Sequence, residues 1–539
     1  MAEFDYVIVG AGSAGAVLAN RLSEDPRVTV LVLEAGGTDA NFWIQMPIGY
    51  GKTYYDARVN WKYTTEPVPG LGGKRSYWPR GKVIGGSSAI NAMVYVRGHP
   101  TDFDDWAEAG ATGWGWQGVE PYFRRMERWS GNACAERGSD GPLMVQDIRD
   151  QVHPLCQTYL AAARESQIAV TDDYNGAEME GASLYQLTTH GGIRASTARC
   201  YLRPALRRRN LTLAKHAHVT GLMLQDGRAR GVRYRRGGQE TVAQARREVI
   251  LAAGTVNSPQ ILQLSGIGAG ADLQAHGIAV HRDLPAVGAH MQDHIGVDFH
   301  FRSRVPTLNQ VLRPWSGRLR VGLQYLLTQR GPLSLSINQA GGFVRTRPEL
   351  TAPNLQLYFS PVSYTRAPPG KRPMMSPDPF PGFLIGYNTC RPRSRGRVGI
   401  RSADPFAQPV IEPNYFDDEE DMAEAIDAAH FVRRLSRAPS LTAVIESTIS
   451  PTEDKACDAT LGDFIRDQAW TVFHPCGTCR IGTDPAQSVV DPRLRVHGVD
   501  GLRVVDASVF PNITSGNINA PTIMVAEKAA DLIREDAMA

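Results

Sequence analysis

Short apolar runs and a helical pattern of apolar positions follow one another at the start of the chain. The runs at 6–9 and 28–33 are rich in valine, isoleucine and leucine, and their length is typical of buried strands. Between them, residues 16–22 carry apolar side chains at helical spacing. The pattern therefore predicts a strand, a helix and a second strand that ends at Glu34.

The same reasoning predicts pairs of strands and helices later in the chain. Residues 249–252 form another apolar run, and Ser258-Pro259 favours the start of a helix after it, because proline suits a first helical turn. Towards the C-terminus, a strand and Asp506 precede a loop and a helix that we expect to begin around Pro521.

Two patterns in the middle of the chain predict a hairpin and an amphipathic helix. Asp226-Gly227 separates two strand-like runs and suits a tight turn. The helix has arginines on its flanks and four leucines at helical spacing: Leu319, Leu323, Leu326 and Leu327. We expect it to pack on the protein's own sheet, with contact to a membrane surface as the alternative.

Composition narrows the class of protein. The 539 residues are 42% apolar, enough for a large core and more than one domain, and the net charge of +3 gives no sign of nucleic-acid binding. Seven cysteines, an odd number spread over the chain, do not suggest a disulfide framework. No basic leader is visible, and no apolar run reaches the roughly 18 residues that a membrane span needs. We expect a soluble, cytoplasmic protein without a membrane span, with contact to the inner membrane's surface as an alternative.

The glycines after the first strand form the pattern G-x-G-x-x-G. Gly10 suits a tight turn, Gly12 lets the backbone approach a pyrophosphate, and Gly15 allows the helix to pack closely. Glu34 ends the second strand, where a ribose hydroxyl needs an acceptor. This order of elements predicts a dinucleotide site. It does not distinguish NAD from FAD, because both contain the adenosine diphosphate half.

The stretch FHPCGTCRIG at 473–482 allows three interpretations: a metal site, a redox disulfide or a catalytic base. Zinc needs three or four ligands, and His474 with Cys476 and Cys479 has no second matched pair nearby. A redox Cys-x-x-C usually opens a helix, whereas a glycine and a loop-like segment follow here. On the residues alone, two packed cysteines and a hydrogen-bonded core histidine are the commoner outcome.

A second histidine pair occurs in HMQDH, where His290 and His294 stand four positions apart. The glutamate of a zinc-protease helix is replaced by Met291, and the stretch follows a proline and a glycine that indicate a loop. We expect a structural role for this segment rather than a zinc site.

Four separated motifs together resemble the glucose–methanol–choline (GMC) family of flavoprotein oxidoreductases. They are the dinucleotide unit at 10–34, RGKVIGGSSAINAMVYVRG from Arg80, GTVNSPQILQLSGIG from Gly254, and the C-terminal pair HPCGTCRIG and NINAPTIMVAEKAAD. The resemblance runs from Phe4 to Ile533 in the right order. It is strongest for bacterial alcohol dehydrogenases of the choline-dehydrogenase-like and sorbose-dehydrogenase-like kind, and it implies FAD.

Carried over residue by residue, the resemblance implies contacts to each part of FAD. The adenosine diphosphate half would be held by Gly10, Gly12, Ser13, Ala14, Glu34 and Ala35. The isoalloxazine would be lined by Gly85, Gly86, Asn91, Ala92, Met93 and Val94. The remaining contacts would come from Val219, Asp506, Ala507 and Asn519. Some relatives attach FAD covalently through a histidine directly before the asparagine of GGSSxxN, and because Ile90 stands there we expect non-covalent FAD.

The resemblance also implies the chemistry. In relatives, the histidine of H-P-x-G-T faces the flavin and pairs with a His or Asn before the final helix; these are His474 and Asn519 here, with Asn517 as the second choice. His474 would accept the hydroxyl proton, Asn519 would hold the developing alkoxide, and hydride would pass to flavin N5. We expect oxidation of a primary alcohol or polyol, with a quinone or dye as electron acceptor. The alternatives are an oxidase that uses oxygen, a hydroxynitrile-lyase-type member of the family, and a non-catalytic flavoprotein.

The predicted fold is α/β (α+β overall), with a discontinuous Rossmann-like FAD-binding domain and an inserted substrate domain on an antiparallel sheet with helices. The FAD-binding domain is expected at 1–152, 195–297 and 466–539, and the substrate domain at 153–194 and 298–465. The latter is rich in prolines and aromatics and carries no cofactor motif. Its proline-rich run at 367–381 is interpreted as a loop, either a lid over the active site or a surface excursion.

Overall fold

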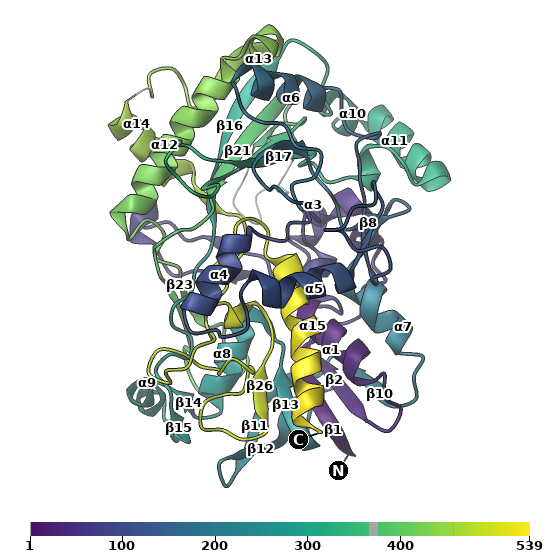
Figure 1. The fold of residues 1–539 in the computed structure, drawn as a ribbon, viewed down its shortest axis with the longest axis vertical. Helices are drawn as coiled ribbons and strands as arrows, with labels where there is room; N and C mark the ends of the chain where they lie inside the picture. The colour runs from purple at the N-terminus through teal and green to yellow at the C-terminus, as the bar shows by residue number, and fades with distance from the viewer. Residues whose placement is uncertain (1, 366–375, 456, 539) are drawn as a thin grey trace.

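The computed structural model describes residues 2–365, 376–455 and 457–538, and two large sheets form its framework. Figure 1 shows the first sheet in the lower half of the molecule and the second in the upper half, with both chain termini at the lower end. The first sheet contains parallel strands, and the second is antiparallel and carries helices. The predicted fold class is confirmed.

The first sheet is organised around β1 (Ala2–Val9), in the strand order β10-β2-β1-β13-β12-β11 with β26 beside β13. Val7 of β1 is in parallel register with Leu31 on one side and Val249 on the other, and all three side chains are buried. The hairpin of β11 and β12 turns at 226–227, as predicted, where both residues have positive φ. The other strands are β2 (Val30–Glu34), β10 (Leu211–Lys215), β11 (His218–Gln225), β12 (Arg228–Arg236), β13 (Gln239–Leu251) and β26 (Leu502–Val504).

The second sheet has the strand order β24-β16-β21-β18-β17-β7, with β25 beside β16. Its central strand β21 is buried along its whole length, so the sheet is covered on both faces. The strands are β7 (Gly181–Leu184), β16 (Ile295–Ser303), β17 (Ala340–Val344), β18 (Leu355–Ser360), β21 (Gly382–Thr389), β24 (Ile445–Ser450) and β25 (Trp470–Thr471).

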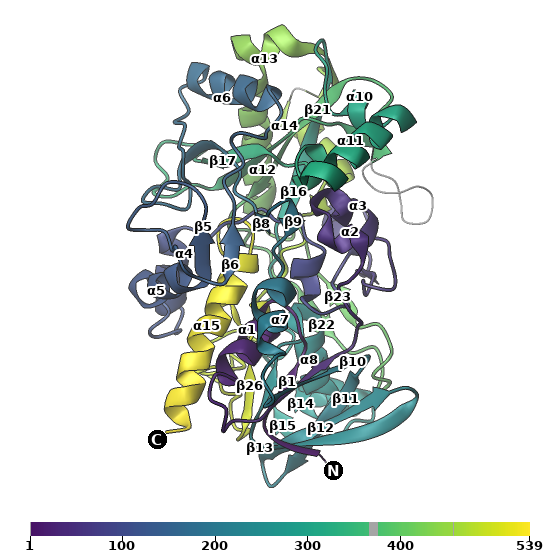
Figure 2. The same ribbon diagram turned by 90° about the vertical axis from the view of Figure 1, so that its right-hand side faces the viewer.

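Helices cover both sheets, and α1 and α15 lie side by side along one flank of the first sheet (Figure 2). The longer ones are α1 (Ser13–Leu22), α4 (Pro100–Glu108), α5 (Trp116–Met126), α6 (Leu155–Glu165), α8 (Gly254–Leu264), α11 (Trp315–Thr328), α12 (Glu419–Ser436), α14 (Asp458–Gln468) and α15 (Asn519–Asp536). The shorter ones are α2 (Phe42–Gln45), α3 (Tyr50–Thr53), α7 (Arg203–Ala205), α9 (Gly270–Ala275), α10 (Asn309–Leu312) and α13 (Pro439–Val444). None of the helices in the described part of the chain has the length and apolar character to cross a membrane.

Helix α8 begins earlier than its sequence suggests. It starts at Gly254, so Pro259 lies inside the helix rather than opening it. Proline has no amide proton, and the carbonyl oxygen of Thr255 therefore loses its usual partner within the helix. The hydroxyl of Thr478 donates to that oxygen at 2.7 Å. A distant side chain thus replaces the missing hydrogen bond, and the helix tolerates the proline.

The prediction that the leucine-rich helix packs on the protein's own sheet is wrong for the leucines. In α11, only Val321 and Tyr325 are buried, and the predicted leucines are exposed. The pattern identified a helix correctly but did not show which face the protein covers.

The domain boundaries proposed from the sequence stay a prediction, although the second sheet extends beyond two of them. Residues 295–297 belong to β16, and residues 470–471 form β25, so both pair within the second sheet. The sequence assigned these residues to the other domain. Most of the proline-rich run at 367–381 lies outside the described residues.

A buried carboxylate connects α15 to other helical segments in the lower half of the molecule. Glu527 accepts hydrogen bonds from the guanidinium of Arg21 at 2.9 Å, from Arg125 at 3.0 Å and from the hydroxyl of Tyr201 at 2.8 Å. Its side chain is fully buried. The carboxylate thereby joins α15 to α1, to α5 and to the helical turn at 198–202 that carries Tyr201.

We predict that Glu527→Ala destabilises the holoenzyme by about 1–3 kcal/mol, because the buried hydrogen bonds to Arg21, Arg125 and Tyr201 are lost while Arg21 and Arg125 keep their outer partners Glu24 and Asp531. The thermal unfolding midpoint of the variant, compared with the unaltered protein, measures the effect. Arg27→Ala, which breaks an exposed pair with Asp25, is the control and should leave the midpoint in place. Equal midpoints for all three proteins would contradict the prediction.

Candidate functional site

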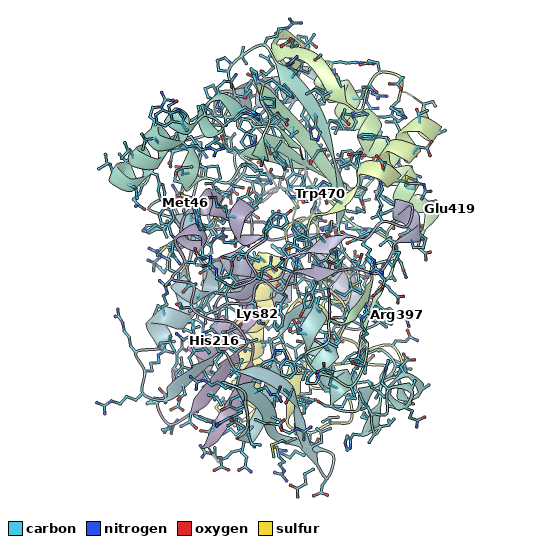
Figure 3. All side chains as sticks on the ribbon, turned by 180° about the vertical axis from the view of Figure 1, so that it is seen from behind. Met46, Lys82, His216, Arg397, Glu419 and Trp470 are labelled. Carbon is cyan, nitrogen blue, oxygen red and sulfur yellow. The ribbon has the colours of Figure 1, made fainter. Side chains whose placement is uncertain are left out.

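A cavity begins at the carboxyl ends of β1 and β2 and extends to residues 472–475, which follow β25 at the edge of the second sheet. Sheets with parallel strands bind ligands at this end of the strands. Trp470, on β25, lies where the upper half of the molecule meets its middle (Figure 3). The cavity therefore connects the predicted dinucleotide unit with the predicted catalytic histidine.

Almost every residue expected to contact the cofactor lines this cavity. These residues are Gly10, Gly12, Ser13, Ala14, Glu34, Ala35, Gly86, Asn91, Ala92, Met93, Val94, Val219, Asp506, Ala507 and Asn519. Gly85 is the exception: its amide donates to the carbonyl of Ala11 at 2.7 Å, and it supports the turn without lining the cavity. His474 also lines this cavity.

The glycines allow backbone segments to meet without side chains between them. Gly10 has a φ of +100°, and a Cβ there would lie 2.5 Å from the carbonyl oxygen of Ala252. A Cβ on Gly86 would lie 2.7 Å from the Cα of Gly12. Any side chain at these positions would push apart the two backbone segments that form the floor of the cavity.

Glu34 presents a buried carboxylate to the adenosine end of the cavity. It accepts hydrogen bonds from the amides of Ala11 at 2.9 Å and Gly36 at 2.7 Å. Burial raises the pKa of this carboxyl to about 7, against the lowering effect of the two amides. Each carboxylate oxygen can accept more than one hydrogen bond, so the group can still receive a ribose hydroxyl.

A chain of hydrogen bonds fixes the orientation of the histidine ring at the other end. His294 Nε2 lies 2.8 Å from the carbonyl oxygen of Cys390, which can only accept, so this nitrogen carries the proton. His294 Nδ1 is then an acceptor and receives the Nδ1–H of His474 at 3.0 Å. It follows that Nε2 of neutral His474 has a free lone pair, and the Asn517 side-chain amide donates to it at 2.9 Å.

Burial keeps both imidazoles neutral. It lowers the pKa of His294 to about 4, and it lowers the pKa of His474 well below its usual value, with His294 and the cationic Arg80 acting in the same direction. A proton acceptor must be unprotonated before the reaction, and a lowered pKa provides that state at neutral pH.

Asp293 holds the backbone on which the histidine stands. Its carboxylate accepts the amide proton of His474 at 2.7 Å and also accepts from the hydroxyls of Tyr415 and Thr471. The carboxyl is buried, and burial raises its pKa to about 6. The guanidinium of Arg80 donates to the carbonyl of Phe473 at 2.7 Å and restrains the same loop.

The structure places Asn517, not Asn519, against His474. Asn519 is the first residue of α15, and its side-chain oxygen accepts from the hydroxyl of Ser13 at 2.8 Å. Asn517 precedes the helix, and its oxygen accepts from Gln356 Nε2 at 3.2 Å, which turns its NH₂ group towards the imidazole. The prediction that Asn519 pairs with His474 is therefore corrected. Asn519 faces the start of α1, and Asn517, the second choice from the sequence, contacts the histidine.

The two cysteines of the FHPCGTCRIG stretch are free, buried thiols in the hydrophobic core that contains the first sheet. Burial raises the pKa of both Cys476 and Cys479, which suppresses the thiolate forms needed for redox chemistry or metal binding. In the ranges that the structure describes, no three His, Cys, Asp or Glu side chains gather in a way that could hold a metal ion.

A second, smaller cavity adjoins the first on the side of the second sheet. The two share walls at Ala92, Val94 and Asn517, so the second opens towards the partner of the histidine. Six aromatic residues line it: Tyr50, Tyr54, Tyr358, Tyr364, Trp470 and Phe473. This position suits a substrate whose hydroxyl group reaches His474 while the rest of the molecule contacts aromatic faces.

Comparison with known proteins assigns the N-terminal and the C-terminal parts of the chain to one family. Models of the GMC oxidoreductase family match residues 4–296 and 392–526. The chain is 43% identical to the oxygen-dependent choline dehydrogenase of Rhizobium etli (strain CIAT 652) and 42% identical to the alcohol dehydrogenase [acceptor] of Pseudomonas putida, each over 98% of this chain and 95% of the relative.

The chain belongs to the GMC oxidoreductase family.

Solved structures of two enzymes share the fold of this GMC oxidoreductase over nearly their full length. Pyridoxine 4-oxidase from Mesorbium loti has a TM-score of 0.88 at 30% identity, covering 99% of both chains. A variant of the formate oxidase of Aspergillus oryzae RIB40 has a TM-score of 0.91 at 29% identity, covering 100% of this chain and 99% of that one.

Family membership implies FAD, and the cavity fits it. The glycine floor, the first turn of α1 and the Glu34 carboxylate suit the adenosine diphosphate half, and residues 91–94 line the same cavity as His474. Ile90 also lines the cavity, at the position where some GMC oxidoreductases carry the linking histidine.

Sequence reasoning missed three residues of the site. His294 was assigned a structural role, and neither Asp293 nor Arg80 was singled out. The available signal was the Asp-His pair itself, since a buried carboxylate beside a buried histidine needs partners that only another segment can supply. That segment, around His474, lies 180 positions away from His294.

Proposed function

We propose that the protein oxidises a primary alcohol or polyol to the aldehyde or ketone, with non-covalently bound FAD and with a quinone or other non-oxygen acceptor. The observation that carries the proposal is the uncharged Nε2 of His474, fixed as an acceptor by His294 and directed at Asn517 between the two cavities. Non-covalent binding is supported by Ile90, which cannot form the linkage that a histidine makes.

His474 and Asn517 have different roles at the substrate oxygen: one accepts its proton and the other donates a hydrogen bond to it. The hydroxyl of the alcohol takes the place of the Asn517 donor at His474 Nε2 and gives up its proton to that nitrogen. The released NH₂ group of Asn517 then donates to the oxygen as negative charge develops on it. Bound FAD supplies the acceptor for the hydride that leaves the adjacent carbon. The carbon loses two electrons as hydride, the oxygen loses a proton, and the carbonyl compound remains.

The chain positions these groups before substrate arrives. Gln356 holds the Asn517 oxygen, Asp293 holds the His474 backbone, and His294 holds the ring. Because none of these contacts needs to break except that between Asn517 and the imidazole, little reorganisation precedes proton transfer.

A second candidate substrate is choline. The aromatic side chains around the second cavity favour it, because aromatic faces attract a quaternary ammonium group. The name of the Rhizobium etli relative supports the same substrate, and that of the Pseudomonas putida relative supports a general alcohol. Their names also differ in the acceptor, oxygen for one and an unspecified acceptor for the other.

Anaerobic mixing of the holoenzyme with primary alcohols, polyols and choline tests the proposal. At least one primary alcohol or polyol should bleach the flavin absorbance, which should recover quickly on adding a quinone or dye and only slowly in air. Rapid recovery in air would assign an oxidase instead. Choline is itself a primary alcohol, so bleaching by choline and by none of the other alcohols would select the second candidate. No bleaching by any CH–OH compound would refute alcohol oxidation.

The two asparagines provide a matched pair of variants. His474→Ala should lower the rate of flavin bleaching by roughly two to four powers of ten, because the proton acceptor is lost. Asn517→Ala should lower it by about 10²–10³, the usual effect of removing one donor to a developing oxyanion. Asn519→Ala, which removes a hydrogen bond to Ser13 on the wall of the cofactor cavity and no contact to His474, should cost less than about ten-fold at equal FAD content. An Asn519 effect as large as that of Asn517, at equal FAD content, would contradict the assignment.

The lowered pKa of His474 predicts the acid side of the pH profile. The neutral, reactive form exists above the pKa, so His474 itself should add no inflection to kcat/KM at about 6.5, where an ordinary histidine titrates. Activity should fall only in more acid solution, and Asp293, with a pKa near 6, contributes to that fall as it takes up a proton. The variant Asp293→Asn removes the contribution of Asp293 to the acid side of the profile and leaves that of His474. If the unaltered protein and Asp293→Asn both show a single inflection at or above about 6.5, His474 does not have the lowered pKa on which the prediction rests.

A further inference from the structure

Helix α11 presents a row of large apolar side chains to solvent. Five of its residues are more than half exposed: Trp315 at 78%, Leu319 at 55%, Leu323 at 51%, Leu326 at 62% and Leu327 at 83%. They stand at helical spacing and so form one continuous stripe, which we call the apolar stripe. Monomeric proteins seldom leave such a surface uncovered, because its exposure to water is unfavourable.

The apolar stripe is not the face that attaches the helix to the protein. Val321 and Tyr325 are the buried residues of α11, and at 3.6 residues per turn they lie roughly opposite the stripe. The hydroxyl of Tyr325 donates to the carbonyl of Gly192 at 2.9 Å and anchors that side. Figures 1 and 2 both show α11 at the outer edge of the upper half, with the body of the molecule on one side only.

Positive charge borders the apolar stripe. Arg318 and Arg320 are exposed and, by the same helical geometry, lie on opposite sides of it, and exposed Arg313 precedes the helix. The surrounding segment, 299–348, contains no aspartate or glutamate but eight arginines: Arg302, Arg304, Arg313, Arg318, Arg320, Arg330, Arg345 and Arg347. Arg330, Arg345 and Arg347 pair with Asp150, Glu180 and Asp427 from other segments, so the positive charge beside the stripe comes from Arg313, Arg318 and Arg320.

The helix also lies close to the second cavity. The turn Pro332–Ser334 contacts α11, and Ile337, three residues further on, lines the cavity. Leu308 and the partly buried Leu312, at the base of the same projection, share a hydrophobic cluster with the cavity residues Tyr50, Tyr54 and Tyr364.

We propose that the apolar stripe of α11 is a docking surface for an anionic phospholipid bilayer. The leucines and Trp315 enter the boundary between headgroups and acyl chains, and the arginines on both sides contact lipid phosphates, with the helix lying in the plane of the membrane. The proposal does not depend on which alcohol or electron acceptor the enzyme uses. It places the side of the molecule next to the second cavity on the membrane.

A second copy of the chain is a poorer occupant. A stable interface buries about 800 Å² on each partner, with about 20–30 residues a side, whereas the apolar stripe has only five. Two stripes facing each other would also bring Arg318 and Arg320 of both copies together without acidic partners. A bilayer needs no matching shape and supplies the negative charge.

Sedimentation of the holoenzyme with lipid vesicles tests the proposal. The protein should bind vesicles of phosphatidylglycerol and phosphatidylcholine, and the variant Leu319→Ser/Leu323→Ser/Leu327→Ser should lose at least about ten-fold in partition coefficient. Arg318→Gln/Arg320→Gln should reduce binding to the mixed vesicles and remove its dependence on phosphatidylglycerol. Added salt should also weaken the binding of the unaltered protein to these vesicles, because it screens the attraction between the arginines and the lipid phosphates.

Matched controls separate membrane docking from damage to the fold. Leu206→Ser changes a leucine that is 37% exposed elsewhere on the surface and should leave vesicle binding unchanged. Oxidation of a water-soluble alcohol with a dye acceptor should be the same in all variants, because the stripe contacts none of the site residues. Equal vesicle binding by the unaltered protein and the leucine variant would overturn the proposal. So would a dimer in analytical ultracentrifugation that the leucine variant dissociates, since the stripe would then belong to a second copy.

Discussion

The hydrogen bond between two buried imidazoles decides what the rest of the site can do. A neutral imidazole has one donor and one acceptor, so fixing one nitrogen fixes the other. The carbonyl of Cys390 fixes His294, and His294 fixes His474, which leaves Nε2 of His474 as the acceptor in the cavity. With the opposite tautomer this nitrogen would carry a proton and could not receive one from an alcohol.

This arrangement depends on the position of the second sheet over the cofactor cavity. Cys390 follows β21, His294 precedes β16, and Gln356, which orients Asn517, lies on β18. These three strands are neighbours at the centre of the sheet, where burial and continuous pairing hold the backbone in place. The first sheet contributes the glycine turn and Glu34 at the carboxyl ends of its parallel strands. Neither sheet forms the site alone.

The parts of the structure that depend on local pattern were predictable from the sequence. The first strand, helix and strand, the glycine turn and the hairpin at 226–227 involve residues close together in the chain, and their periodicity and turn chemistry are sufficient. His474 was found through its family motif rather than from its own surroundings. Its partner was not, because the difference between Asn517 and Asn519 depends on where α15 begins. Helix α15 starts at Asn519, which directs that side chain to Ser13 and leaves Asn517 free to face the imidazole.

Helix α11 shows a different limit of the same method. Hydrophobic periodicity reports that one side of a helix is apolar, but it does not identify what covers that side. In α11 the protein covers a narrow face with Val321 and Tyr325, which have a β-branched and an aromatic side chain and pack well in a small contact. The leucines that dominate the pattern face away from the molecule. The charge of the neighbouring residues carries the missing information. An apolar face bordered by the exposed Arg318 and Arg320, on a helix without carboxylates, is unsuited to a protein interior and suited to an anionic surface.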